Sequence, residues 1–68
     1  MNVKYFTDTD TALIQFSSRP VEETRAVSAN VYIDLDQDGN LVNMTIEHAR
    51  VTANLPIVVV EEVAPDAA

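Results

Sequence analysis

One Asp-Gly pair, set between two alternating segments, constrains the fold of this chain more than any other feature. Apolar and polar residues alternate over residues 31–36 and again over residues 41–47, and Gln37-Asp38-Gly39-Asn40 separates the two segments. Such alternation is typical of strands with one buried face, and Asp-Gly between them favours a tight hairpin turn. Gly39 is the only glycine in the chain, and glycine tolerates the positive φ that such turns require. The sequence therefore predicts a β-hairpin over residues 31–47.

The residues before this hairpin predict further strands. Residues 3–6 and 12–16 are rich in β-branched and aromatic side chains, and the polar cluster Thr7-Asp8-Thr9-Asp10 between them is typical of a turn. Residues 21–27 have no clean apolar face either as a strand or as a helix, so their conformation stays open between the two. An exposed edge strand is favoured because its neighbours are strands and because charged side chains protect an edge from aggregation.

After the hairpin, the pattern changes. Residues 47–54 contain good helix formers and predict one to two helical turns that end at Pro56. Residues 57–63 are rich in valine and predict a last strand. The expected fold class is α+β and mainly β: a small antiparallel β-meander of about five strands with one short helical segment. Residues 1–63 would form a single domain, and residues 64–68 a disordered C-terminal tail.

The small size of the chain limits its core. A domain of 68 residues buries only about 60% of the surface that its unfolded chain exposes. There is no cysteine, so disulfides and thiolate zinc sites are excluded. Because a single sheet leaves one apolar face uncovered, we expect a homodimer. The residues expected to be buried, either between the two copies or under the helix, are Ile14, Phe16, Ile33, Leu35, Met44 and residues 58–60.

The charge of the chain excludes several function classes. Eleven acidic residues against four basic ones give a net charge of −7, which repels nucleic acids and anionic lipid surfaces. No segment reaches the roughly 18–20 apolar residues that a membrane span requires, and the first residues lack the apolar stretch of a signal peptide. We therefore expect a cytoplasmic protein with no nucleic-acid or membrane partner, whereas its acidic surface would suit a basic protein partner.

A partial calcium-loop motif lies in the predicted hairpin. Asp34-x-Asp36-x-Asp38-Gly39 matches the first half of such a loop, but its twelfth position is Thr45 and not the bidentate glutamate that the loop needs. We interpret Asp34 and Asp36 as residues on a solvent face and Asp38 as the cap of the turn. No cofactor or metal site is predicted, and whether the three carboxylates bind any cation stays open.

Catalytic candidates are few. His48 is the only histidine, and a general base needs a carboxylate to orient it and a substrate within reach. A surface histidine is the favoured interpretation. Asp8 and Asp10 form a carboxylate pair, but acid-base chemistry needs a concave and partly dry pocket, so turn capping is favoured for them. No catalytic residue is predicted.

Three stretches together resemble a known family. They are YFTDTDTALIQFS (residues 5–17), VEETRAV (residues 21–27) and VYIDLDQDGNLVNMTIEHA (residues 31–49). They are similar to the small bacterial proteins grouped as domain of unknown function 2283. The resemblance implies a small antiparallel sheet with a short helical piece and no assigned activity. Members are sometimes encoded beside small toxin-like proteins, which implies an antitoxin or partner-binding role.

These observations predict a non-enzymatic protein-interaction module, antitoxin-like or regulatory. The alternative is a small hydrolase-type enzyme or ligand-binding protein that uses His48 and nearby carboxylates.

Overall fold

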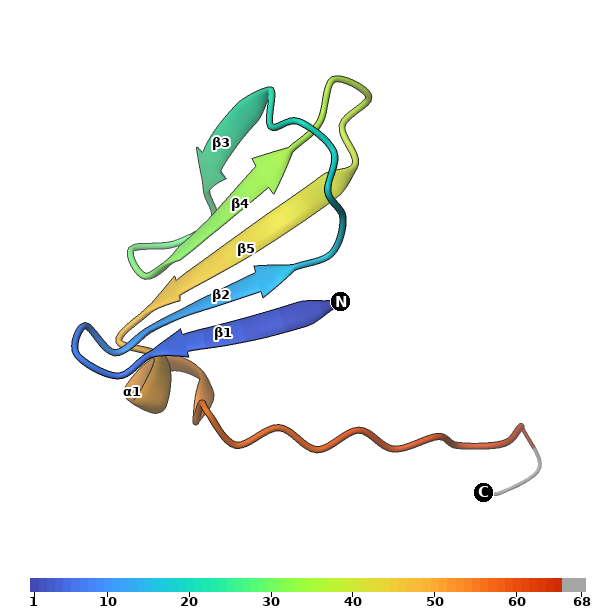
Figure 1. Ribbon diagram of the computed structural model, residues 1–68. Coiled ribbons are helices and arrows are strands. Elements are labelled where there is room, and N and C mark those ends of the chain that lie inside the picture. The colour runs from blue at the N-terminus through green and yellow to red at the C-terminus, as the bar shows by residue number, and fades with distance from the viewer. Residues whose placement is uncertain (66–68) are drawn as a thin grey trace.

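Among the residues that the structure describes, five strands and one short helix form the body of the protein (Figure 1). The computed structural model describes residues 1–65. Its elements, in chain order, are β1 (Asn2–Phe6), β2 (Thr11–Gln15), β3 (Glu23–Ala26), β4 (Val31–Leu35), β5 (Leu41–Glu47) and α1 (Ala49–Ala53). The predicted fold class, a mainly β antiparallel sheet of five strands with one short helix, is confirmed.

The strand order departs from a simple meander at one place. The order across the sheet is β1-β2-β5-β4-β3, and every pairing is antiparallel. After β2 the chain passes the ends of β5 and β4 to reach β3 at the far edge (Figure 1). Strands β2 to β5 thus have the spatial order of a Greek key. As a result, β5 is the central strand, and the connection over residues 16–22 lies beside the β4–β5 turn.

The predicted hairpin is present as β4 and β5. Its strands pair from Val31 opposite Ile46 to Leu35 opposite Leu41, with a register shift between Asp34 and Leu35. At the turn, Gly39 has a φ of 80°, which is the left-handed conformation that glycine adopts without steric cost. The amide of Gly39 donates to the carbonyl of Asp36 at 3.1 Å and closes the turn.

The segment whose conformation the sequence left open is a strand. β3 pairs with β4 at the edge of the sheet, and all four of its residues are exposed. An edge strand without a buried face needs no apolar periodicity, because its order comes from backbone pairing on one side.

The two faces of the sheet differ in polarity. On one face, register partners Val3, Ile14, Met44 and Ile33 form an apolar row across four strands. The buried core lies at one end of this face and consists of Ala12, Ile46, Ala49 and Leu55. The opposite face carries a polar row across all five strands, Asn2, Gln15, Asn43, Asp34 and Thr24.

Helix α1 covers only the end of the apolar face where the core lies. It covers five residues, in agreement with the predicted one to two turns, and both flanking residues, His48 and Asn54, are in the left-handed conformation. Ala49, on the helix, is fully buried against the sheet. Along the rest of the face, Leu35 is buried, whereas the predicted core residue Phe16 remains 41% exposed.

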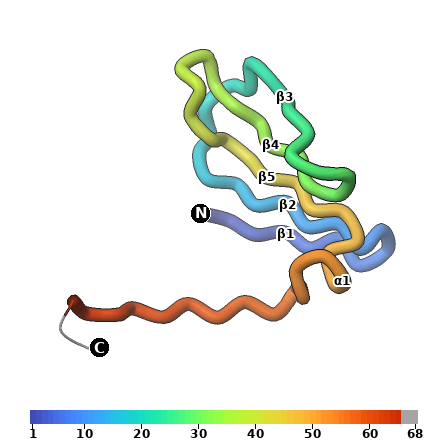
Figure 2. The backbone as a smooth tube through the Cα atoms, turned by 180° about the vertical axis from the view of Figure 1, so that it is seen from behind, coloured from blue at the N-terminus to red at the C-terminus, as the bar shows by residue number. Residues whose placement is uncertain are grey.

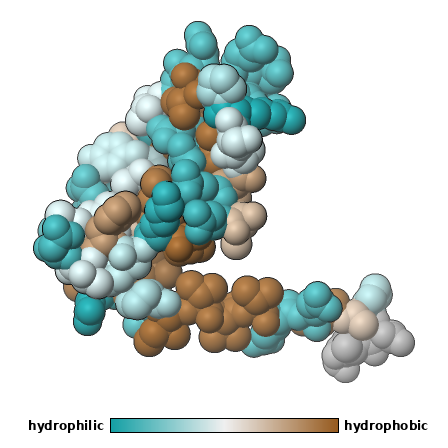
Figure 3. Space-filling view, in the orientation of Figure 1, coloured by the Kyte–Doolittle hydropathy of each residue, from teal (hydrophilic) through white to brown (hydrophobic). Residues whose placement is uncertain are grey.

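The prediction of a last strand over residues 57–63 is wrong. This segment, which we call the C-terminal arm, contains no strand and leads away from the sheet (Figures 1 and 2). Its apolar side chains are 55–81% exposed in the run of residues 57–60, and they form an apolar stretch outside the body (Figure 3). A strand needs a paired neighbour, and composition alone does not supply one.

Two other sequence-based predictions concern this end of the chain. The domain boundary at residue 63 stays a prediction. Of the tail predicted over residues 64–68, residues 66–68 lie outside the described part. Among residues 1–65, no helix has the length and apolar character needed to cross a membrane.

Candidate functional site

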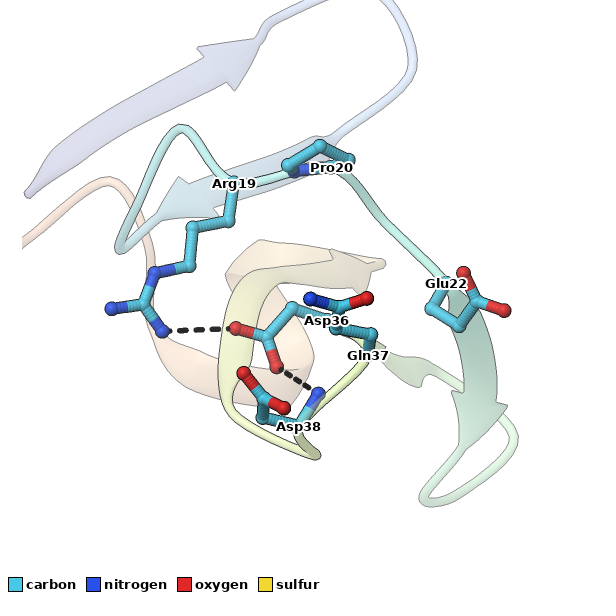
Figure 4. Close-up of a pocket in the computed structure, with 6 residues that line it drawn as sticks. All are labelled: Arg19, Pro20, Glu22, Asp36, Gln37 and Asp38. Atoms are coloured by element: carbon cyan, nitrogen blue, oxygen red, sulfur yellow. Dashed lines mark hydrogen bonds and ion pairs between the residues drawn. The ribbon is translucent and has the colours of Figure 1, made fainter.

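A polar pocket lies where the β2–β3 connection passes over the β4–β5 turn (Figure 4). Its volume is about 350 Å³. The connection supplies three of its lining residues and the turn supplies the other three: Arg19, Pro20, Glu22, Asp36, Gln37 and Asp38. Residues far apart in sequence meet here because the crossover to β3 has to pass the hairpin end.

Asp36 is the structural centre of this pocket. Its residue surface is only 6% exposed. One carboxylate oxygen, Oδ1, accepts hydrogen bonds from the backbone amides of Asp38 at 2.9 Å and Asn40 at 2.8 Å. The other oxygen, Oδ2, accepts from Nη1 of Arg19 at 3.0 Å. Asp36 therefore caps the turn and also ties the crossover to it. The prediction that Asp36 lies on a solvent face and that Asp38 caps the turn is wrong.

These contacts favour the ionised form of the buried carboxylate. The backbone amide of Asn40 is the largest cause that lowers the pKa of Asp36, followed by the hydrogen bond from Arg19. Burial acts in the opposite direction, and the amide of Asp38 adds a further lowering. The charges of Asp36 and Arg19 thus compensate one another inside the pocket.

Two more carboxylates remain at the pocket. Glu22 and Asp38 both line it, and neither side chain makes a hydrogen bond or ion pair with another residue in the range 1–65. Figure 4 shows them on opposite sides of the pocket, one from each segment. With Arg19 neutralised by Asp36, the pocket carries a net negative charge. Its chemistry suits a cationic side chain.

The three aspartates of the partial calcium loop do not converge. Asp34 lies on the polar face of the sheet, where it accepts from Oγ1 of Thr24 at 2.7 Å and from Nδ2 of Asn43 at 3.1 Å. Asp36 points into the turn, as described above. Among the described residues, no group of three or more histidine, aspartate or glutamate side chains is arranged to hold a metal ion. The spacing of these aspartates matches the first half of a calcium loop, but the hairpin separates their side chains.

A second polar cluster joins the first turn to helix α1. The hydroxyl of Tyr5 donates to Oδ1 of Asp10 at 2.6 Å and accepts from Nε of Arg50 at 2.9 Å. The backbone amide of Arg50 also donates to the same Asp10 oxygen at 3.2 Å, and the amide of Ala49 donates to the Asp10 carbonyl at 2.9 Å. The predicted turn at residues 7–10 is present. The Asp10 carboxylate thus joins β1 to the start of α1, and it accepts no backbone amide of its own turn in the described residues.

His48 lies at the other end of β5 from the pocket. It is exposed, immediately precedes α1, and has a φ of 52°. Its imidazole makes no hydrogen bond with another residue in the described part of the chain. The nearby Asp10 carboxylate is engaged by Tyr5 and Arg50. The structure therefore does not bring His48 together with a carboxylate that orients it.

Sequence reasoning missed two components of the pocket. Neither Arg19 nor Glu22 was identified as a candidate site residue from the sequence. No local pattern pairs Arg19 with Asp36, since 17 positions separate them. A usable signal was the position of Asp36 two residues before Asp38-Gly39, which is where a side chain can accept amides of the turn.

Comparison with known proteins found a match to one protein family. A family model described as "Protein of unknown function (DUF2283)" matches residues 2–50, the stretch that contains the whole sheet and the start of α1. Neither the curated proteins nor the solved structures contain a match.

Proposed function

The chain belongs to the DUF2283 family of proteins of unknown function, and we propose that it is a non-enzymatic protein-interaction module that binds a basic protein. One observation carries the proposal: a concave pocket in which two carboxylates, Glu22 and Asp38, have no partner within the described chain. An antitoxin-like or regulatory role would fit such a module.

The chemistry of the pocket favours a basic side chain over an apolar small molecule. Small-molecule sites usually have volumes of about 300–1,000 Å³ and are lined mostly by apolar and aromatic groups. This pocket is at the lower end of that range, and Pro20 is its only apolar lining residue. A lysine or arginine side chain that enters it would find carboxylates from two sides and would leave no buried charge unpaired.

The charge of the whole chain supports the same partner class. A net charge of −7 accelerates encounter with a basic protein and disfavours acidic competitors. The pocket would then fix the orientation of the partner, because the Arg19–Asp36 pair anchors one wall to the other.

The test uses the protein encoded by the neighbouring reading frame. We expect a 1:1 mixture of the two purified proteins to form a complex whose dissociation constant rises steeply with salt. Surface plasmon resonance at several salt concentrations measures both the affinity and the association rate. A neighbouring protein that shows no binding at low salt would contradict the proposed partner.

Matched variants separate the pocket from the general charge. Glu22→Gln together with Asp38→Asn removes two charges at the pocket, whereas Asp8→Asn together with Glu47→Gln removes two exposed charges elsewhere. We expect the pocket variant to lose about tenfold or more in affinity, as expected for charge pairs in contact, and the control to lose much less. Equal losses of affinity in the two double variants would mean that binding depends only on the overall charge of the protein and not on the pocket.

A further inference from the structure

The protein exposes more surface than a compact chain of its size. Its accessible surface is 5162 Å², which is roughly 900 Å² more than the area scaling for folded monomers gives for 7.5 kDa. Its radius of gyration is 13.9 Å, against roughly 11 Å expected for 68 residues. The C-terminal arm contributes to this difference, because it leaves the body of the protein (Figure 2).

The arm has the composition of a strand but lacks a neighbour. Residues 57–60 are all β-branched, a composition that favours extended, paired backbone. Within residues 1–65, the backbone of residues 58–65 makes no hydrogen bond in a turn and belongs to no sheet. A run of exposed valines whose backbone amides and carbonyls are unpaired can add to the edge of a sheet as a further strand.

The sheet has two edges, and they differ in how well they are protected. β3 is four residues long, carries the Glu23–Arg25 ion pair, and follows Glu22. Short length and charge are the features that discourage strand addition. β1 is five residues long and carries a single charge, Lys4, and its outer side has no neighbouring strand. The open edge is therefore β1.

Charge complementarity favours the same edge. The arm continues from its valines into Glu61 and Glu62. The acidic residues Glu22 and Glu23 at the β3 edge would repel this pair, whereas β1 offers Lys4. The Lys4 side chain makes no ion pair or hydrogen bond with any other described residue, in contrast to Arg19, Arg25 and Arg50.

We propose that the arm of one copy adds to the β1 edge of a second copy, and that the exchange is reciprocal. An arm of seven residues spans about 23 Å when extended, which is enough to pair with the whole of β1 at about 17 Å. Each copy then has its arm and its open edge paired, so that the assembly closes as a two-fold dimer and does not continue as a fibre. The roughly 900 Å² of extra surface corresponds to the roughly 800 Å² that each partner buries in a stable interface. This dimer does not depend on the pocket or on the basic partner proposed above.

Light scattering after size exclusion, from micromolar to millimolar protein, tests the association. We expect a dimer for the full chain and a monomer for a chain that ends at Pro56, with the far-UV circular dichroism of the sheet retained. A full chain that stays monomeric throughout this range would overturn the proposal. So would a chain without the arm that still dimerises, because the contact would then involve other surfaces.

Point variants test backbone pairing without removing the arm. Val59→Pro deletes one amide donor, and Val59→Thr keeps both the amide and the β-branched shape. We expect the proline variant to raise the dimer dissociation constant by tenfold or more and the threonine variant to change it by less than threefold. Equal effects of the two would overturn backbone pairing. Lys4→Glu should raise the dissociation constant several-fold, whereas the same charge change at the other edge, Arg25→Glu, should not.

The identity of the edge is tested with a mixture of isotope-labelled and unlabelled chains. Isotope-filtered NMR should show contacts between the valine methyl groups of a labelled arm and Val3 or Tyr5 of an unlabelled chain. Contacts seen only within one chain, in a monomer, would mean that the arm folds back onto its own β1, and they would overturn the exchange.

Discussion

The hydroxyl of Tyr5 lies 2.6 Å from Oδ1 of Asp10 and bridges the turn that joins β1 and β2. Because Asp10 also accepts the backbone amide of Arg50 and the Tyr5 hydroxyl accepts from Nε of Arg50, the same pair joins the first hairpin to helix α1. The pair thereby holds α1 at the core end of the apolar face. In a marginally stable domain, the loss of one such hydrogen bond is a measurable fraction of the total stability.

Tyr5→Phe should therefore destabilise the protein by about 1.5–3 kcal/mol, the usual range for a hydrogen bond to a charged group. The variant removes one hydroxyl and leaves the ring in place. Urea unfolding followed by circular dichroism measures the loss. Tyr32→Phe is the matched control, since the Tyr32 hydroxyl makes only a 3.4 Å contact with the carbonyl of Ala29. Equal losses for the two variants would contradict the role of the Tyr5–Asp10 contact.

Replacing Asp36 should change how stability depends on pH. The folded protein lowers the pKa of Asp36 below its ordinary value, chiefly through the backbone amide of Asn40 and the hydrogen bond from Arg19. Its stabilising contribution is therefore fully present above the unfolded-state pKa and is lost as the pH falls through the lower, folded value. Asp36→Asn should lower the urea midpoint at pH 7, and its difference from the unmodified protein should shrink below about pH 4. Asp38→Asn removes a neighbouring carboxylate but keeps the capping contacts, so it should leave the urea midpoint at pH 7 nearly unchanged.

Gly39→Ala should cost about 1–2 kcal/mol, because an L-residue with a side chain pays this penalty in the left-handed region. The φ of Gly39 is 80°, and a Cβ built there meets no atom within 4 Å. The cost is thus conformational and not steric. Gly39→Asn should cost less, since asparagine adopts positive φ more readily. Urea unfolding measures the loss of unfolding free energy in both variants. A larger loss for Gly39→Asn than for Gly39→Ala would contradict this explanation.

Ala49→Leu should destabilise by about 1–3 kcal/mol, the usual cost of adding volume to a packed site. Ala49 is fully buried between α1 and the sheet, so a larger side chain displaces the helix. Ala53→Leu, on the same helix but exposed, is the control and should change the unfolding free energy by less than about 0.5 kcal/mol. Thermal and urea unfolding provide the comparison. Equal losses for the two would mean that the helix does not pack as described.

Much of the local structure followed from the sequence. Alternation over residues 31–36 and 41–47, together with one glycine at Gly39, was sufficient for the central hairpin, because both signals act between residues close in the chain. The first turn also followed from local composition, whereas residues 21–27 stayed open between strand and helix because neither pattern gives them an apolar face. The candidate pocket did not, since half of its lining comes from a connection with no pattern of its own.

Only the tertiary structure decided where distant segments meet. Pairing of β2 with β5 is what carries residues 16–22 past the hairpin end, and this path buries Asp36 beneath Arg19. The sequence alone determined that residues 57–60 prefer an extended conformation, because β-branching acts within each residue. Whether such a segment becomes a strand depends on a partner for its backbone, and within residues 1–65 no strand pairs with it. Local preference is a property of the residues, whereas pairing and burial are properties of the whole chain.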